Sequence, residues 1–585
     1  MKNVADLLVD KFRQASLEAF PELREKGDFP LEIMQSTQEK FGHYQYNSAM
    51  KLAKDLQQNP RAIAESILKH VNQTTEDGNP CIAKLEIAGP GFINITLDSR
   101  FISAGVQTIL NDPHLAIDLP QKKQRIIVEF SSPNIAKELH VGHLRSTIIG
   151  DCLARLFEFL GYDVLRLNHI GDWGTAFGML IAYMKETVPK VLQGEQKTDL
   201  SHLVEWYKAS KQRFDADAQF KRRSQLEVVQ LQGGNPDSLK AWEIICDISR
   251  IAYQEIYDLL DVKLIERGES YYNPMLADIV EDLENKGLVQ ISDGAKCIFL
   301  DGFQNREGEI LPLMVQKSDG GYNYDTTDMA AIRQRIEEEK ADRIIYVTDA
   351  GQSTHFQMIF RAAEKAGYLD PAKVQVDHVT FGVVLGADGK KFRTRAGDTE
   401  KLVDLLYTAV DQANSILKER SQDMSENERE KLAKALGIGA VKYADLSCHR
   451  SSDYTFSYER MLKFEGNTAA FLMYAYVRVA GIKRKVNVDL NAIKEKIELE
   501  HPSEVALGMH LLQFDEALQQ LSKDLLPNRL TEYLYTLADK FNAFFRDCRV
   551  EGTPQQNSRL LLCESVARTM KQGLDILGVK TVEKM

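Results

Sequence analysis

Residues 125–170 read RIIVEFSSPNIAKELHVGHLRSTIIGDCLARLFEFLGYDVLRLNHI, and this stretch decides the fold. The β-branched run RIIVEF predicts a buried parallel strand, and SSPNIAKE predicts the loop after it. A helical pattern then begins near Gly142 and stops at Gly161, a residue type that favours helix termination. DVLRLNHI (163–170) predicts the next strand. This strand–helix–strand order is the start of a doubly wound parallel sheet.

The rest of the chain extends this pattern in both directions. Further strands are predicted at 297–303, 311–318, 342–349 and 374–386, and helices between them at about 327–340 and 354–367. A mostly helical, polar segment interrupts the two halves like an insertion. A chain of 585 residues is too long for one core. We therefore expect a multidomain α/β protein with four parts. These are a small α/β N-terminal domain (1–118), a Rossmann-like domain (119–400) with an insertion at about 185–300, a helical connector (401–450) and an all-α bundle (451–585).

Composition limits the cellular context. The seven cysteines are scattered without a CxxC pair, which predicts reduced thiols in a cytoplasmic protein and no structural metal. We find no apolar run long enough to span a bilayer, so no membrane partner is expected. The net charge of -12 argues weakly against nucleic acid, but local basic faces can still bind phosphate. Candidate basic patches are 221–223, 390–395 and 478–485.

The pair His140 and His143, in HVGH, lies where the first strand gives way to its helix. Open α/β sheets bind ligands at this edge, and a helix N-terminus attracts phosphate. Gly142 lets a nucleotide approach the backbone, and two imidazoles can donate hydrogen bonds to an α-phosphate during in-line attack. The pair therefore predicts nucleotidyl transfer. A shared metal ion remains an alternative, although no zinc-type ligand set lies nearby.

A basic loop, LGADGKKFRTRAGDT (385–399), follows the last predicted strand of the sheet. It contains Lys390, Lys391, Arg393 and Arg395 within six residues. Cations on a loop with flanking glycines can close over pyrophosphate and stabilise its developing charge. An exposed turn with solvated charges is the alternative. Together with HVGH, the loop favours an ATP-using enzyme.

Five long motifs, in the same order, resemble the signatures of the class I arginyl-tRNA synthetase family, in its bacterial type. They are SSPNIAKELHVGHLRSTIIGD, NHIGDWGTAFGML, YNYDTTDMAAI, YVTDAGQSTHF and KKFRTRAGDT. The resemblance extends over nearly the whole chain, with an N-terminal domain that contacts the tRNA elbow and a terminal anticodon-binding bundle. It implies that L-arginine and ATP, with Mg²⁺, form arginyl-adenylate and pyrophosphate. Arginine then passes to the 3′ end of tRNA-Arg. We expect a monomer.

The resemblance also implies roles for individual residues. His140, Gly142 and His143 would lie at the ATP phosphates, and His143 would also contact arginine. Ser132 and Asn134 would hold the α-amino or carboxylate end of arginine. The remaining arginine contacts would be Glu129, Tyr324, Asp328 and Gln352. Carboxylates suit a guanidinium, because its planar fork of donors can be gripped bidentately. Such a site can reject lysine and citrulline without editing.

The second signature departs from the usual class I KMSK. FRTR (392–395) stands in its register, with Lys390 and Lys391 just ahead. We expect Lys391 and Arg395 to bind ATP and act in catalysis, with Lys390 as a substitute. The resembled family also needs bound tRNA to activate arginine.

For tRNA, the stretch FGHYQYNSAM (41–50) matches the family's elbow-binding region. Tyr44, Gln45 and Asn47 are the candidates, because aromatics can stack on bases while amides read their edges. A polar turn before the next helix is the alternative. In the terminal bundle, we interpret the Ala, Leu and Tyr faces of AAFLMYAYVRVAGIKRK as core packing. Arg478 and residues 483–485 could contact phosphate.

Other functions fit the sequence less well. A cysteinyl or glutamyl synthetase would share the chemistry, but the acids Glu129 and Asp328 favour a cationic amino acid. A non-catalytic tRNA-binding descendant should have lost a phosphate-site histidine or the acid of the amino-acid site. A nucleotidyltransferase acting on a small metabolite would not need the long helical C-terminal part.

Overall fold

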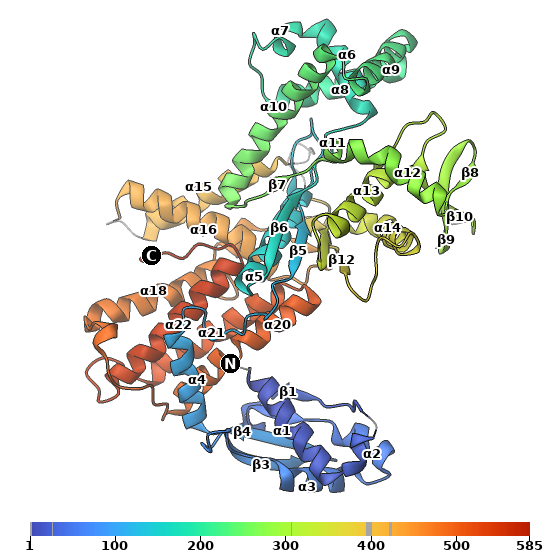
Figure 1. The fold of residues 1–585 in the computed structure, drawn as a ribbon. Coiled ribbons are helices and arrows are strands. Elements are labelled where there is room, and N and C mark those ends of the chain that lie inside the picture. Colours follow the sequence, from blue (N-terminus) through green and yellow to red (C-terminus); the bar gives the residue numbers. More distant parts are fainter. Residues whose placement is uncertain (1–2, 26, 306, 393–399, 421–423) are drawn as a thin grey trace.

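The computed structural model describes residues 3–25, 27–305, 307–392, 400–420 and 424–585. The chain forms an elongated molecule (Figure 1). A helical insertion lies at one end, the N-terminal domain lies at the other, and a parallel sheet and a helical bundle lie between them. No helix in the described ranges has the length and apolar character needed to cross a membrane.

A five-stranded sheet organises the centre of the molecule. All its neighbouring strands are parallel, in the order β12-β11-β5-β6-β7. The strands are β5 (Arg125–Glu129), β6 (Asp163–Asn168), β7 (Ile265–Glu266), β11 (Arg343–Val347) and β12 (Gln375–Val379). Successive strands add to one side of β5 and then, from β11, to its other side. This confirms the doubly wound parallel sheet, and it makes the carboxyl end of β5 and β11 the switch point where ligands bind.

The segment that predicted the fold behaves as its pattern indicated. Ile126, Ile127 and Val128 of β5 are buried, as expected for a central strand covered on both faces. Helix α5 (Val141–Phe159) follows and packs against the sheet. Gly161 adopts φ +85°, a left-handed conformation that ends the helix at low steric cost.

The inserted segment is helical only in its first part. Helices α6 (Thr175–Thr187), α7 (Pro189–Leu192), α8 (Leu200–Ala216), α9 (Ala218–Gln232) and α10 (Pro236–Leu260) form the upper end of the molecule in Figure 1. After Leu260 the chain returns to the central sheet as β7, and α11 (Glu269–Tyr272) and α12 (Leu276–Asn285) follow. The inserted helices therefore end at Leu260, and the predicted helical insertion does not continue to about residue 300.

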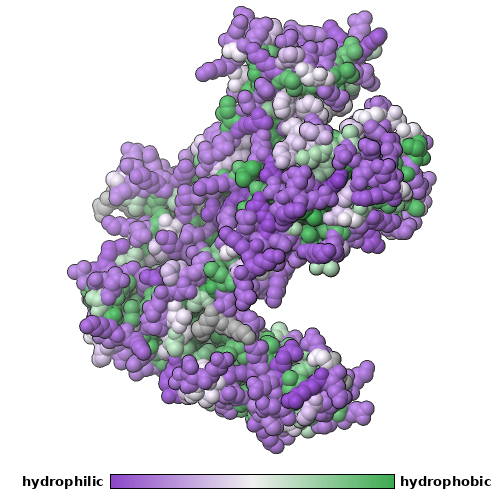
Figure 2. All heavy atoms as spheres, viewed as in Figure 1, coloured by the Kyte–Doolittle hydropathy of each residue, from purple (hydrophilic) through white to green (hydrophobic). Residues whose placement is uncertain are grey.

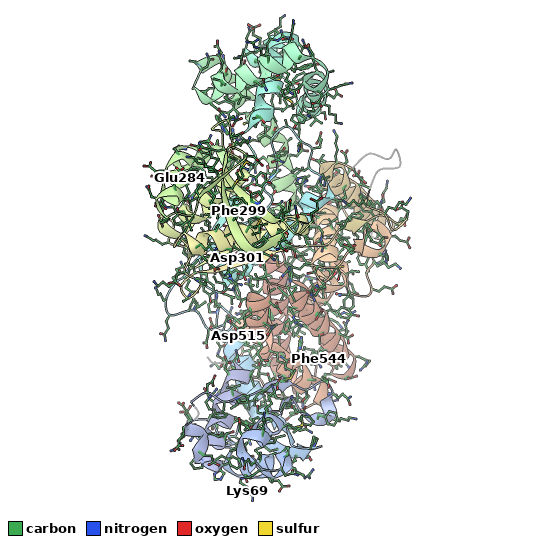
Figure 3. The ribbon with its side chains drawn as sticks, turned by 90° about the vertical axis from the view of Figure 1, so that its right-hand side faces the viewer. Lys69, Glu284, Phe299, Asp301, Asp515 and Phe544 are labelled. Atoms are coloured by element: carbon green, nitrogen blue, oxygen red, sulfur yellow. The ribbon has the colours of Figure 1, made fainter. Side chains whose placement is uncertain are left out.

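A second, antiparallel sheet follows α12. It comprises β8 (Gln290–Ser292), β9 (Ala295–Gln304) and β10 (Ile310–Gln316), in the order β10-β9-β8. Figure 3 shows it face-on, with Phe299 and Asp301 labelled on β9 and Glu284 on α12 beside it. One face packs on α13 (Tyr324–Glu337) and α14 (Ser353–Lys365), which explains the alternating burial along β9. The two strands predicted at 297–303 and 311–318 thus exist, but they lie outside the parallel sheet.

The N-terminal domain is a four-stranded antiparallel sheet with helices. Its strands β1 (Ile33–Gln35), β2 (Tyr44–Tyr46), β3 (Ile82–Ala88) and β4 (Phe92–Leu97) pair in the order β1-β2-β4-β3. Helices α1 (Val4–Ala19), α2 (Ala49–Leu56) and α3 (Pro60–His70) complete it. Helix α4 (Ser99–Asn111) then leaves the domain and packs on the C-terminal bundle (Figure 1).

The C-terminal part is helical. Strands β13 (Val384–Leu385) and β14 (Tyr454–Thr455) form a short parallel pair. The helices α15 (Leu402–Arg420) and α16 (Glu426–Leu446) pack together, and α17 (Tyr458–Met461) leads to the bundle. The bundle contains α18 (Ala469–Val486), α19 (Pro502–Leu512), α20 (Phe514–Asp524), α21 (Asn528–Asp547) and α22 (Gln556–Ile576). In Figure 2 most of the visible surface is hydrophilic.

Candidate active site

Two histidines begin helix α5 and cap it. His140 is the N-cap residue, and its Nδ1 accepts the backbone N–H of Gly142 at 3.1 Å. Nδ1 of His143 accepts the backbone N–H of His140 at 3.2 Å, and the ring centroids are 4.2 Å apart. A Cβ on Gly142 would lie 2.9 Å from Cε1 of His140, so glycine makes room for this ring. HVGH therefore forms one rigid unit at the carboxyl edge of the sheet.

The charge state of these histidines follows from their surroundings. Burial, together with electrostatic repulsion between its charged form and His140, lowers the pKa of His143 to about 3. Burial and the charge of Lys391 lower the pKa of His140. Both rings are therefore neutral at pH 7. Because each Nδ1 accepts a backbone N–H, each ring must carry its proton on Nε2. The unit thus presents two neutral N–H donors.

The basic loop begins and ends beside this unit. At its start, Lys391 forms an isolated β-bridge with Leu385 of β13. At its end, Lys401 forms a bridge with His140. Lys390 and Lys391 are exposed, and Lys391 is close enough to lower the pKa of His140. The fold therefore brings together two motifs that lie about 250 residues apart in the sequence.

The other two loop cations, Arg393 and Arg395, lie outside the described residues. Lys137 is a further exposed cation that the sequence analysis did not single out. Its charge adds to the effects of burial and of His140 in lowering the pKa of His143. No local pattern marks Lys137, and only its position five residues after Ser132, in the loop that follows β5, could have suggested it.

The loop between β5 and α5 has an unusual backbone. Ser131, Ser132 and Ala136 all have φ between +48° and +68°, a region that non-glycine residues rarely occupy. The Ser132 backbone N–H donates to Asn168 Oδ1 at 2.9 Å. Such a strained loop persists only when its surroundings hold it, and it presents the side chains of Ser132 and Asn134 at the sheet edge.

Asn134 is exposed, and its side chain lies against Gly171, where any larger residue would collide with it. A Cβ at Gly171 would lie 1.9 Å from Asn134 Oδ1, and the two residues form an isolated parallel bridge. From α10, the hydroxyl of Tyr253 donates to the carbonyl oxygens of Asn134 and Lys137, at 2.7 Å each. The insertion therefore braces the loop that carries two of the predicted arginine contacts.

An acidic cluster, made of Asp172, Glu269, Asp325 and Asp328, lies beside this loop. Asp172 and Glu269 follow the carboxyl ends of β6 and β7. Asp325 and Asp328 lie at the start of α13, whose other end leads into β11, so they lie at the same edge of the sheet. Asp328 is the predicted arginine contact. Its Oδ2 accepts a hydrogen bond from Nε2 of His355 at 2.6 Å. Asp328 lies in the second turn of α13.

Glu269 was not predicted from the sequence. Burial, together with the nearby carboxylates Asp328 and Asp172, raises its pKa to about 8. A carboxyl group held near neutrality by neighbouring acids gains from a cation placed among them. The signal in the sequence, GESYY after a short strand, carries no recognisable spacing on its own.

Two other predicted arginine contacts flank the cluster. Tyr324 begins α13, is 61% exposed, and its ring meets that of His355 edge-on with 5.1 Å between centroids. Gln352 ends a short 3-10 helix (Ala350–Gln352), is exposed, and precedes the first turn of α14. Neither side chain belongs to the core, so both are accessible to a ligand at this edge of the sheet.

Glu129 has a protein partner. Its Oε2 lies 2.6 Å from Nη1 of Arg335, and the two side chains are 5% and 0% exposed. A buried carboxylate is thereby neutralised by a guanidinium from α13. This ion pair is enough to explain a buried glutamate at position 129. A contact between Glu129 and the substrate arginine stays a prediction. Such a contact would have to use the other carboxylate oxygen of Glu129, Oε1.

The N-terminal residues differ in accessibility. Tyr44 is fully buried, and its hydroxyl donates to Glu516 of the bundle at 2.5 Å. The prediction that Tyr44 stacks on a base needs correction, because no face of its ring is accessible. In β2 the side chains alternate, so Gln45 points to the opposite face and donates to Asn94 Oδ1 at 2.8 Å. Asn47 is half-buried.

Helix α18 presents an exposed aromatic surface, although the pattern of its Ala, Leu and Tyr residues predicted core packing. Tyr474 is 44% exposed and Phe545 of α21 is 43% exposed. The guanidinium of Arg478 lies 5.0 Å from the centroid of each ring. This stacking platform (Tyr474, Arg478 and Phe545) has the exposed aromatic faces and the positive charge that single-stranded nucleic acid binds.

Family models match three consecutive parts of the chain. Residues 5–97 match "Arginyl tRNA synthetase N terminal domain" and residues 105–458 match "tRNA synthetases class I (R), catalytic domain". Residues 472–585 match "DALR anticodon binding domain". The first two motifs discussed above, the histidine pair and the basic loop, lie in the second of these ranges.

Known proteins resemble the chain over its whole length. An arginine–tRNA ligase of Protochlamydia amoebophila is 66% identical over 588 residues, covering 100% of both chains. That of Chlamydia abortus is 51% identical and covers 98% of each. Arginyl-tRNA synthetase of Plasmodium falciparum superposes with a TM-score of 0.87 at 33% identity, covering 100% of both chains. The enzyme of Thermus thermophilus, at 24% identity and a TM-score of 0.80, shows the common fold.

Proposed function

Because the chain belongs to the class I arginyl-tRNA synthetase family, we propose that the residues at the carboxyl edge of its sheet divide the steps of that reaction among them. The protein is an arginine–tRNA ligase. It activates L-arginine with ATP to arginyl-adenylate, releases pyrophosphate, and transfers arginine to the 3′ end of tRNA-Arg. These residue roles are supported above all by one observation: the histidine pair, the basic loop and the acidic cluster lie at one edge of the sheet.

His140 and His143 act at the phosphates of ATP. Two neutral Nε2–H donors can follow the α-phosphate as the arginine carboxylate attacks it, because their bonds strengthen as negative charge builds on the phosphate oxygens. Gly142 admits the nucleotide to the helix N-terminus. Mg²⁺ would be held by the phosphate oxygens of ATP rather than by a protein cage, and it would supply positive charge to the phosphates.

Lys391 and Arg395 bind the departing pyrophosphate, with Lys390 as a substitute. Lys391 is the best supported of the three, since its charge reaches His140 and its backbone is fixed to β13. A loop with anchored ends can close over ATP without losing its register on the histidines.

Lys391→Ala should lower the rate of arginine-dependent ATP–pyrophosphate exchange by about 10²-fold, as loss of one group that stabilises transition-state charge does. Lys390→Ala is the matched comparison and should lower the rate by less than about 5-fold, because it is the charge of Lys391 that lies close enough to His140 to lower its pKa. Equal effects of the two substitutions, or a larger effect at Lys390, would contradict the assignment.

The arginine site uses the acidic cluster for the guanidinium and the strained loop for the other end. Asp328 and Glu269 offer carboxyl oxygens to the planar donors. Burial and the neighbouring carboxylates together keep the pKa of Glu269 near 8, and a bound cation relieves the repulsion between those carboxylates. Ser132 and Asn134 hold the α-amino or carboxylate group. His143 lies near the reacting carboxylate.

Three further side chains complete the proposed arginine site. Tyr324 covers the site from α13, and Gln352 borders it at the start of α14. Glu129 contributes its free oxygen from the end of β5, next to its bond with Arg335. Lysine would leave part of this acceptor array unpaired, so the site can reject it by binding alone.

Two regions serve tRNA-Arg. We propose domains at 1–118 and 451–585 for the elbow and the anticodon, around a Rossmann-like unit at 119–400 and a connector at 401–450. Gln45 and Asn47 remain the elbow candidates. The stacking platform on α18 and α21 suits unpaired anticodon bases. A monomer in the cytoplasm fits seven free cysteines.

Tyr474→Ala should raise the Kd for tRNA about 10-fold, since stacking of one base contributes about 1–3 kcal/mol. Arg478→Ala should also weaken tRNA binding, and it alone should reduce the slope of log affinity against log salt by about 1. Filter binding across a salt series measures both. Arg361→Ala, on the exposed face of α14, is the control and should change neither. An unchanged tRNA affinity for Tyr474→Ala would exclude the platform from the interface.

A further inference from the structure

His355 lies between two acids of the acidic cluster. Its Nε2 donates to Asp328 Oδ2 at 2.6 Å, and its Nδ1 forms an ion pair with Asp325 Oδ1 at 3.1 Å. A carboxylate is an acceptor only, so a ring that serves one on each side must carry both protons. His355 is therefore an imidazolium that bridges the two carboxylates.

The surroundings of His355 support this charge. The titratable groups that face it are Tyr324, Asp325 and Asp328 on α13 and His378 on β12. Burial by itself lowers the pKa of His355, but the hydrogen bonds and charges of the two aspartates outweigh burial and raise it to about 9. The charge is thus retained at neutral pH in a mostly buried ring.

The two aspartates differ in what their second oxygen does. Asp325 is fixed, because its Oδ2 accepts the backbone N–H of Met314 from β10 at 3.1 Å. Asp328 has no such backbone anchor among the hydrogen bonds of the described residues, and its Oδ1 lies 3.7 Å from Nε2 of His169. The bridge therefore transmits the fixed position of Asp325 to the carboxylate of Asp328.

We propose that His355 is a positioning and specificity-determining residue, which holds the Asp328 carboxylate by one oxygen so that the other meets the guanidinium of arginine. This inference rests on the proposed role of Asp328. A carboxylate held at one rotation presents a fixed acceptor beside Glu269, which suits a planar fork of donors. A carboxylate that can rotate freely could bind the compact ammonium group of lysine equally well. His355 should therefore raise the preference for arginine over lysine.

Two substitutions separate the contacts of the ring. In His355→Gln the side-chain amide reaches the position of Nε2 and can still donate to Asp328. In His355→Asn the shorter amide reaches the position of Nδ1 and retains only the contact with Asp325. Both replace the imidazolium by a neutral amide, so they form a matched pair that differs in which aspartate is held.

For His355→Asn we expect kcat/KM for arginine to fall about 30-fold in ATP–pyrophosphate exchange, mainly through KM, as on loss of a charged hydrogen bond. The ratio of arginine to lysine activation should fall as well, and KM for ATP should not change. For His355→Gln the fall should stay within about 5-fold. Equal losses in both variants, or a change in KM for ATP, would overturn the proposal and leave His355 as a packing link between α13 and α14.

A double mutant shows whether His355 acts through Asp328. If it does, His355→Asn should add less than about 2-fold to the loss already caused by Asp328→Asn, because coupled residues are not additive. Multiplying effects would overturn the proposal while leaving the role of Asp328 intact. No effect of Asp328→Asn alone would overturn both. The two failures are therefore distinguishable.

The pH dependence gives a readout that a packing role would not move. The pKa of His355 is raised, so its full charge is present at low pH and is lost as pH rises through about 9. In the unaltered enzyme, kcat/KM for arginine should fall through this range, and the fall should be smaller in His355→Gln. Glu269 and the arginine α-amino group titrate in both enzymes, so the difference between the two profiles isolates His355. Superimposable profiles would contradict the proposal.

Discussion

Replacing Asp328 by Asn should raise the KM for arginine by about 10²- to 10³-fold, the cost of truncating one partner of a desolvated charge pair. The amide keeps the size of the side chain and can still accept from His355, but it removes the negative charge that the guanidinium needs. Steady-state ATP–pyrophosphate exchange at varied arginine measures the effect. KM for ATP and the affinity for tRNA should stay nearly unchanged, because neither ligand meets this side chain in the proposed site.

A matched control makes the Asp328 result specific. Asp301→Asn makes the same chemical change on the exposed side of β9, outside the acidic cluster, and should leave arginine kinetics unaltered (Figure 3). The thermal unfolding midpoint of each variant should be recorded, so that loss of folded protein is not mistaken for loss of binding. Unchanged arginine kinetics in a folded Asp328→Asn enzyme would show that the acidic cluster is not the guanidinium site.

Replacing His140 by Asn should reduce the rate of adenylate formation by about 10²- to 10³-fold, with little change in KM for arginine or ATP. Asn is among the best N-cap residues, and its amide oxygen can take over the hydrogen bond from Gly142, so α5 should still begin where it does. What is lost is the Nε2–H donor. Because that donor serves the transition state, the loss should appear in kcat.

The same change at His143 tests which ring matters more. His143→Asn keeps an acceptor near the position of Nδ1 for the His140 N–H and again deletes the Nε2 donor. His202→Asn, at an exposed position on α8, is the control and should have the activity of the unaltered enzyme. If Asn at both 140 and 143 leaves exchange unchanged, the pair does not act at the phosphates.

The parts of the fold that local pattern determines could be predicted. A buried β-branched strand, a capped helix and a terminating glycine placed β5, α5 and Gly161 within a residue or two. The sheet membership of β9 and β10 could not be predicted in this way. Alternation shows that one face of a strand is buried, but not which strand it pairs with or which helices cover it.

The site shows the same division. HVGH and the basic loop have recognisable sequences, so their meeting could be anticipated. His355 could not, because its role depends on two aspartates 27 and 30 residues earlier that reach it only through the packing of α14 on α13. Likewise the partner of Glu129 is Arg335, from a distant helix. In β2, alternation separates Tyr44 from Gln45, but only the packing of the domain decides that the tyrosine is inside.

Amino-acid-dependent ATP–pyrophosphate exchange, with each of the twenty amino acids and with and without tRNA-Arg, tests the central claim most directly. With tRNA-Arg present, arginine should be the only one of the twenty amino acids that drives exchange, at a rate that falls in Asp328→Asn and His140→Asn. Lysine should give no measurable exchange at the same concentration. Exchange driven by another amino acid, or no exchange with arginine in the presence of tRNA-Arg, would contradict the account.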